Sequence, residues 1–152
     1  MKTLLLCMLL LGAPLAQAAD RLTEENIGAM YAQLIAAAQD KNVEGVLEHM
    51  SDEVRIRIQA PSAMGGDMEM DKRQYRELLT QGWDGVDDYR LEVEIQQIDI
   101  TADGQSASVR DLTRETLRIQ GSEVEASTLE TATLQLLDGK VKFSRIDGII
   151  QP

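Results

Sequence analysis

The chain has 152 residues, which is enough for one domain and too few for most multi-domain enzymes. Its 26 acidic and 15 basic residues give a net charge of −11, which opposes binding to nucleic acid or anionic lipid because such binding needs clustered cations. Aromatic residues make up only 3% of the sequence, so a large stacking surface for bases or flat cofactors is not expected. The sequence also has no motif of a metal site, phosphate-binding loop or activated nucleophile, so we predict no cofactor and no nucleic-acid partner.

Residues 1–18 have the features of a secretory signal peptide. A positive N-terminus precedes the apolar run Leu4–Leu11, and Ala16–Ala18 forms an A-x-A cleavage site. The apolar run is too short and wrongly flanked for a membrane span. We therefore predict cleavage after Ala18 and export to the periplasm, with an uncut anchor as the less favoured alternative. The remaining residues, 19–152, are predicted to form a single domain that is not attached to the membrane.

Cleavage at this position changes the charge and the chemistry of the chain. It removes one lysine and no acid, so 134 residues with a net charge of −12 remain. It also removes Cys7, the one cysteine, which lies too early in the apolar run to be a site of lipid attachment. Without cysteine the domain has no disulfide, thiol nucleophile or thiolate metal site, so a hydrophobic core must hold it together. A domain of this length buries about two-thirds of its unfolded surface, which is sufficient.

The first half of the mature chain is predicted to be mainly helical. Thr23 is a suitable N-cap for a first helix, and two glutamates in the first turn favour the helix dipole. Apolar side chains then follow in one helical stripe: Ile27, Met30, Tyr31, Leu34, Ile35 and Ala38. Asn42 caps a short second helix, whose apolar face comprises Val43, Val46, Leu47 and Met50. A third helix begins at a capping box of Asp71 and Gln74, with a stripe of Tyr75, Leu78, Leu79 and Trp83.

Strands are predicted between and after these helices. A first strand covers residues 54–59, and residues 60–70 form a loop or an irregular second strand. From Asp88 onward the apolar period is two, but its parity changes at Gln96 and Gln97, which predicts a β-bulge. Three further antiparallel strands follow, over residues 106–119, 124–137 and 140–146, with turns at 102–105, 121–122 and 138–139.

Two segments of this α+β layout carry a resemblance to a known family. Residues 36–47 (AAAQDKNVEGVL) and residues 138–147 (DGKVKFSRID) resemble the NTF2-like (SnoaL-like) superfamily, whose element order matches the whole mature chain. The resemblance implies a cone-shaped, curved antiparallel sheet with three helices from the N-terminal half packed on its concave face. The superfamily includes isomerases, dehydratases, cyclases, binding proteins and structural subunits, so the resemblance does not identify an activity.

A cone of this kind encloses a pocket, and strand parity indicates which polar side chains face it. Asp111, Glu115, Glu130 and Arg145 share the parity of the apolar residues on their strands. Carboxyl groups on an apolar face have raised pKa values unless they are paired, and a proton-transfer base requires such a raised pKa. We expect Arg145 to pair with Glu130 or Asp111 and to depress their pKa values, which would make them poor bases. A carboxyl that faces away from Arg145, or that a bulge turns outward, is the alternative.

Tyr31 and Trp83 complete the predicted pocket lining. Resemblance to the superfamily's isomerases would call for an acidic base opposite a buried hydroxyl donor, and Tyr31 is the donor that the sequence places best. A core tyrosine with its hydroxyl at the rim is the alternative. Dehydratases and cyclases of the superfamily use an Asp–His pair, but this chain has only His49, which is expected to be solvated at the end of the second helix. Trp83 is expected in the core or as a lid over the pocket.

For two further groups of residues, we favour a structural role over a functional one. Met64, Met68 and Met70, with His49, resemble a soft ligand set for Cu(I), but methionines in one loop commonly fill apolar gaps. Arg55 and Arg57 could hold an anionic ligand or partner, but we favour a solvated strand face as their explanation. We therefore predict no metal site.

Three classes of function agree with these features. The first is a non-catalytic binding or interaction module for a small apolar or amphipathic ligand, with a homodimer formed through the sheet. The second is a small-molecule isomerase or dehydratase, which the missing Asp–His pair disfavours. The third is an acidic inhibitor or immunity-like partner of a basic protein, because a charge of −12 would steer association.

Overall fold

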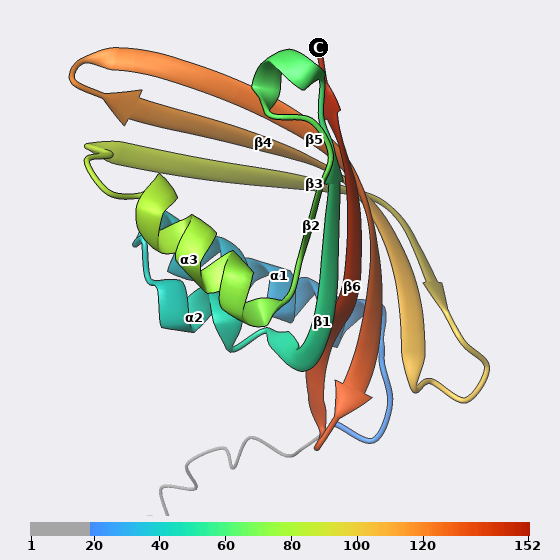
Figure 1. Ribbon diagram of the computed structural model, residues 1–152. Helices are drawn as coiled ribbons and strands as arrows, with labels where there is room; N and C mark the ends of the chain where they lie inside the picture. The colour runs from blue at the N-terminus through green and yellow to red at the C-terminus, as the bar shows by residue number, and fades with distance from the viewer. Residues whose placement is uncertain (1–18) are drawn as a thin grey trace, which may run out of the picture.

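The computed structural model describes residues 19–152, so the predicted signal peptide and its cleavage site at residues 1–18 lie outside the described residues. Three helices cover one face of a curved, unclosed six-stranded sheet (Figure 1). The helices are α1 (Glu24–Gln39), α2 (Val43–Leu47) and α3 (Lys72–Gly82), and a 3₁₀ turn, η1, covers Ser62–Met64. Among residues 19–152, no helix is both long and apolar enough to span a membrane.

The predicted helix starts are confirmed. Thr23 caps α1 and forms a capping box with Asn26, and Asp71 does the same for α3 with Gln74. The Asn42 side chain accepts a hydrogen bond from the third residue of α2. Each of these side chains satisfies a backbone N–H that has no partner within its helix, which sets where the helix begins.

The sheet contains the predicted meander and two strands from the first half of the chain. Its order is β2-β1-β6-β5-β4-β3, and every pairing is antiparallel except that of β1 with β6, which is parallel. The sheet is therefore mixed, whereas an antiparallel one was expected. The strands are β1 (Met50–Gln59), β2 (Met68–Met70), β3 (Asp88–Ile100), β4 (Ser106–Ile119), β5 (Ser122–Leu137) and β6 (Lys140–Gln151).

Two β-bulges change which side chains face the helices. The pairing of β3 with β4 skips Gln96, which confirms the bulge predicted there. The pairing of β5 with β6 skips Ser144, because Thr133 pairs with Arg145 while Leu134 pairs with Phe143. An unpaired residue reverses the alternation of side chains after it. On β6, Phe143 therefore faces the helices before the bulge, and Ile146 does so after it.

The hairpin turns agree with strand twist. Asp138 and Gly139 both have positive φ, as does the pair Gln120 and Gly121, and two such residues form the turn that matches the twist of the flanking strands. The turn between β4 and β5 thus lies one residue earlier than predicted. The core lies between the helices and the concave face of the sheet, where Ile27, Leu47, Val109, Leu134 and Phe143 are almost completely buried.

Candidate functional site

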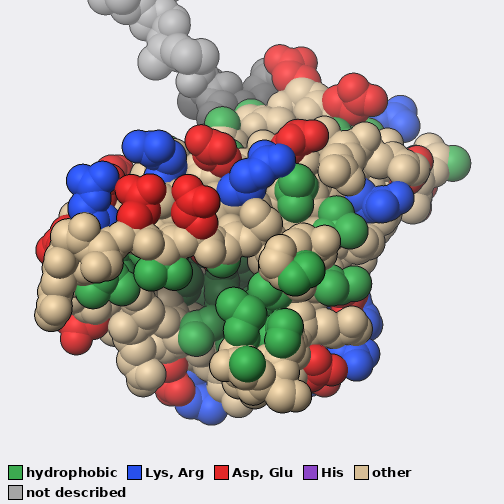
Figure 2. All heavy atoms as spheres, turned by 90° about the horizontal axis from the view of Figure 1, so that it is seen from above, with side chains coloured by type: hydrophobic (Ala, Val, Ile, Leu, Met, Phe, Trp, Pro, Cys, Tyr) green, Lys and Arg blue, Asp and Glu red, His purple; other side chains and the backbone are tan. Residues whose placement is uncertain are grey.

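A cavity of about 330 Å³ lies between the helices and the concave face of the sheet. Seen from above, the molecule is hollowed there, and hydrophobic side chains gather around the hollow while charged ones lie outside it (Figure 2). Helix α3 contributes Tyr75 and Leu79 to its lining, and its C-cap residue Trp83 lies there too. The sheet supplies the opposite wall. This volume suits a small molecule with a largely apolar body.

The aromatic residues of the chain are concentrated at this cavity. The sequence contains one Trp, one Phe and three Tyr, and all five line it: Tyr31, Tyr75, Trp83, Tyr89 and Phe143. Two pairs lie edge to face, Tyr31 with Phe143 and Trp83 with Tyr89, each with ring centroids 5.5 Å apart. Edge-to-face pairs add stability beyond the area that they bury, so these rings form stiff walls.

Behind the aromatic lining lies a buried carboxyl group with two hydroxyl donors. Asp111, on β4, is completely buried. The Tyr31 hydroxyl donates to its Oδ2 and the Thr113 hydroxyl to its Oδ1, each over 3.0 Å. Burial raises the pKa of Asp111, and the two hydrogen bonds oppose this rise. Burial and the nearby Asp111 carboxyl also raise the pKa of Tyr31 well above its usual range, so its hydroxyl stays protonated.

A second carboxyl group, that of Glu130 on β5, faces the cavity directly. Glu130 is the cross-strand partner of Asp111 and lies on the same face of the sheet. Burial, followed by repulsion from Asp111 and Glu115, raises the pKa of Glu130 to about 8. Glu130 is therefore largely protonated at neutral pH and lies close to equal occupancy of its two forms slightly above it.

Glu115 is the third acid of the site. It lies on β4 at the cavity wall and accepts a hydrogen bond from the Tyr89 hydroxyl. Burial and the Glu115 carboxyl raise the pKa of Tyr89 well above its usual range. Burial likewise raises the pKa of Tyr75, on α3, with smaller contributions from Glu130 and Glu115. The cavity therefore combines carboxyl groups with phenol donors that do not ionise at neutral pH.

Five of the six predicted pocket residues lie at this site. Tyr31, Trp83, Glu115 and Glu130 line the cavity, and Asp111 lies directly behind Tyr31. Tyr75 and Tyr89 were not predicted as polar lining, although both could have been found. Tyr75 is on the predicted apolar stripe of its helix, and Tyr89 has the parity of the buried Leu91 on β3.

The prediction for Arg145 is wrong. Its side chain lies outside the cavity and is 56% exposed, and its guanidinium pairs with Asp147 at 2.5 Å. The bulge at Ser144 turns Arg145 outward. In the sequence, the apolar Ile146 lies three positions after Phe143, which breaks the strand alternation and was the signal of that bulge. Because no Lys, Arg or His of residues 19–152 lines the cavity, the pKa values of Asp111 and Glu130 are not depressed as expected but raised.

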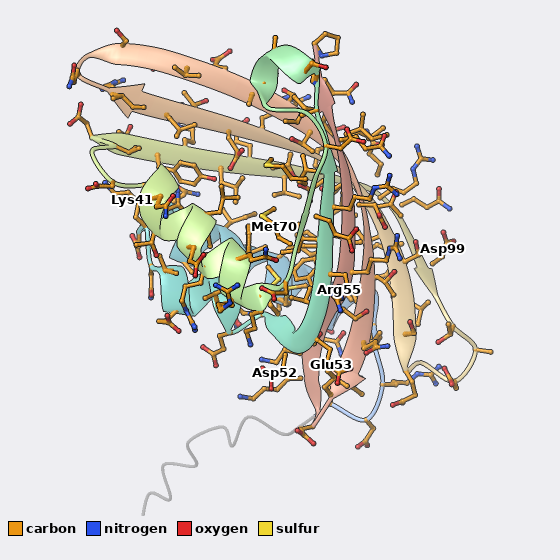
Figure 3. All side chains as sticks on the ribbon, viewed as in Figure 1. Lys41, Asp52, Glu53, Arg55, Met70 and Asp99 are labelled. Atoms are coloured by element: carbon orange, nitrogen blue, oxygen red, sulfur yellow. The ribbon has the colours of Figure 1, made fainter. Side chains whose placement is uncertain are left out.

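The remaining candidate residues lie outside the cavity or form part of its wall. His49 is half-buried at a separate hollow beside Lys140 and Lys142, and burial lowers its pKa. Met70, on β2, is buried at the cavity wall and points toward the helices (Figure 3). Met64 is exposed. Within residues 19–152, no group of three His, Cys, Asp or Glu side chains is arranged to hold a metal ion.

The outer face of the sheet is polar. Arg55 and Arg57 are exposed on β1, at positions that alternate with the buried Val54 and Ile56. Arg57 is the register partner of Asp147 on β6, next to the Arg145–Asp147 pair. This arrangement agrees with a solvated strand face rather than with a site that holds an anion.

Comparison of the sequence with protein-family models and with curated proteins gives no match. Solved structures with the same fold are numerous. A ketosteroid isomerase-like protein from Erwinia carotovora atroseptica has a TM-score of 0.66 and 18% identity, over 86% of this chain and 100% of its own. A type-3 hexachlorocyclohexane dehydrochlorinase, LinA, from Novosphingobium barchaimii has a TM-score of 0.66 and 11% identity, over 84% and 86%. AusH from Aspergillus nidulans has a TM-score of 0.63 and 14% identity, over 85% and 86%.

These likenesses define the class of the fold. The chain has the α+β fold of the NTF2-like (SnoaL-like) superfamily, with a curved sheet, three helices and a cavity between them. At identities this low, the shared fold does not carry an activity from one protein to another.

Proposed function

We propose that the protein is an exported module that binds a small, mainly apolar molecule in the cavity beneath α3. The observation that carries this proposal is the placement of all five aromatic side chains around one cavity in a chain that is poor in aromatic residues. Aromatic side chains supply large apolar contact areas at a low cost in conformational entropy, which makes them effective in ligand sites. The periplasmic location belongs to the proposal and is supported by the signal-peptide features of residues 1–18.

Binding is testable because the one tryptophan, Trp83, lies at the cavity. The probe is the neutral fluorophore N-phenyl-1-naphthylamine. We expect its emission to rise on binding and the emission of Trp83 to fall in a saturable manner.

A blocking variant and a matched control make this test specific. Gly82 lines the cavity at the end of α3, and a Cβ added there meets no atom within 4 Å. Gly82→Phe should therefore place a large side chain at the cavity wall and abolish binding without disturbing the core. Gly28, on α1, has the same free space and does not line the cavity, so Gly28→Phe should bind the probe normally. Equal binding by both variants would contradict the proposal.

A second candidate function is supported by Glu130. A carboxyl group with a pKa near neutrality, in an apolar cavity with phenol donors, has the properties of a general acid or base. One structural neighbour is described as ketosteroid isomerase-like, so a β,γ-unsaturated steroid ketone is the substrate to test. Turnover that disappears in Glu130→Gln, with unchanged circular dichroism, would establish proton-transfer catalysis. If the probe binds and the steroid is not turned over, binding is the one function that remains supported.

A further inference from the structure

The charged groups at the cavity are all acids. Glu115 and Glu130 line it and Asp111 lies behind Tyr31, while no Lys, Arg or His from residues 19–152 is part of the lining. Arg145, the basic residue that was predicted to line the pocket, lies on the opposite face of the sheet. Among the described residues, therefore, no basic side chain at the cavity offsets the repulsion that Asp111 and Glu115 exert on Glu130.

The three acids differ in what already satisfies them. Asp111 accepts hydrogen bonds from two hydroxyls, and Glu115 accepts one from Tyr89. The Glu130 carboxyl makes no hydrogen bond to any described residue, yet neither of its oxygens is sealed off, because it faces the cavity. A buried carboxyl group normally has a partner, so the group that would pair with Glu130 is expected to come from the cavity itself.

We propose that the ligand of this cavity is a molecule with a compact apolar body and one protonated amine, whose ammonium group lies against Glu130 and within reach of Glu115. This inference rests on the proposed binding function and specifies the class of ligand. The ammonium would donate hydrogen bonds to the unpartnered carboxyl and offset the repulsion between the acids. The aromatic and aliphatic side chains of the lining would contact the apolar body of the ligand. A bare metal ion would make none of these contacts.

Other ligand charges fit the cavity less well. An anion would be repelled by the acids at the cavity and would find no Lys, Arg or His from residues 19–152 in its lining to pair with. A neutral alcohol or ketone would accept a hydrogen bond from protonated Glu130 but would not offset the repulsion that Asp111 and Glu115 exert on an ionised Glu130. Of these ligands, only one with an ammonium group would both donate a hydrogen bond to the Glu130 carboxyl and compensate the negative charge at the cavity.

Binding of an ammonium group should be linked to proton release. The groups that face Glu130 are Asp111 and Glu115 on β4, Tyr31 on α1, Tyr75 on α3 and Tyr89 on β3, and none of them is basic. Free Glu130, with its pKa of about 8, carries a proton at pH 7, and a bound cation displaces it. Amine binding should therefore tighten as the pH rises from 6 to 8, whereas binding of a neutral analogue should not.

The test uses three molecules of matched shape that do not fluoresce: 1-adamantylmethylamine, 1-adamantanemethanol and 1-adamantanecarboxylate. Affinities come from Trp83 emission and from calorimetry in two buffers with different ionisation enthalpies. We expect the amine to bind at least about tenfold more tightly than the alcohol, because a charge-assisted hydrogen bond is stronger than a neutral one. The carboxylate should bind most weakly. The buffers should also show proton release for the amine at pH 7.

The variants Glu130→Gln and Glu115→Gln separate the roles of the two acids. Glu130→Gln should remove the preference for the amine and the proton release, whereas Glu115→Gln should reduce the preference and keep the release. An alcohol that binds as tightly as the amine, or a preference that survives Glu130→Gln, would overturn the inference. If N-phenyl-1-naphthylamine binds and the amine does not, the ligand class alone is wrong. If neither binds, the proposed binding function itself fails.

Discussion

The Tyr31 hydroxyl and the Asp111 carboxyl meet over 3.0 Å although 80 positions separate them in the chain. This hydrogen bond joins α1 to strand β4 of the sheet. It also forms one wall of the cavity, because Tyr31 lies between Asp111 and the open space. The same contact therefore supports both the packing of the helix and the shape of the site.

Removal of this hydroxyl should destabilise the domain. Tyr31→Phe keeps the ring and its contact with Phe143 but leaves Asp111 with only Thr113 as a donor. We expect a loss of about 1–3 kcal/mol in the free energy of unfolding, measured by urea denaturation at pH 7. Asp111→Asn, which keeps an acceptor for the hydroxyl, is the control and should cost less. A Tyr31→Phe variant as stable as the parent would contradict this account.

Stability should depend on pH through Glu130. Its pKa rises from 4.5 in the unfolded chain to about 8 in the folded protein, so between these values the folded state binds more protons than the unfolded state. The free energy of unfolding should therefore fall as the pH rises from 5 to 8, by up to several kcal/mol, since each pKa unit corresponds to about 1.4 kcal/mol. Glu130→Gln has no titrating group at this position. It should be the more stable protein at pH 8 and should lose most of this pH dependence, and equal slopes for the two proteins would count against the raised pKa.

A helical glycine offers a stabilising substitution away from the site. Gly28 lies within α1, and a Cβ there meets no atom within 4 Å. Gly28→Ala should raise the free energy of unfolding by about 0.5–1 kcal/mol, because alanine restricts the unfolded chain and favours the helix. Thermal unfolding followed by circular dichroism measures the change. Gly45→Ala, where the added Cβ would lie 2.7 Å from the Asn42 side chain, should give no such gain.

Arg145 should be dispensable for the cavity. Its side chain pairs with Asp147 on the exposed face of the sheet, and such exposed ion pairs contribute little. Arg145→Ala should therefore bind N-phenyl-1-naphthylamine with unchanged affinity and keep the pH dependence attributed to Glu130. A loss of binding in this variant would show that the guanidinium reaches the cavity.

Export should produce a defined N-terminus. The A-x-A order at Ala16–Ala18 predicts cleavage after Ala18, so intact mass analysis of the periplasmic fraction should show a chain that begins at Ala19. Substitution of Ala18 by a bulky residue, as in Ala18→Leu, should block processing at this bond. Recovery of a mature protein that still contains Lys2 would contradict the prediction.

Local patterns in the sequence were sufficient for the helix starts, the bulge on β3 and the turn after β5. They did not place the end of α2, because Met50, expected on that helix, belongs to β1. The capping boxes at Thr23 and Asp71 and the parity change at Gln96 each depend on residues a few positions apart. The positive-φ pair at Asp138 and Gly139 is local in the same way. Such features are readable because the hydrogen bonds that define them form within a single helix end, strand or turn.

Long-range pairing decided the site. The parallel pairing of β1 with β6 joins segments far apart in the chain, and no local pattern specifies which strands become neighbours. The bulge at Ser144 sends Arg145 outward, so no basic side chain of residues 19–152 lines the cavity beside Glu130, and the direction expected for its pKa is reversed. Composition and parity could name the acids that face the cavity. Their protonation depends on burial and on the charges nearby, and both are properties of the packed structure.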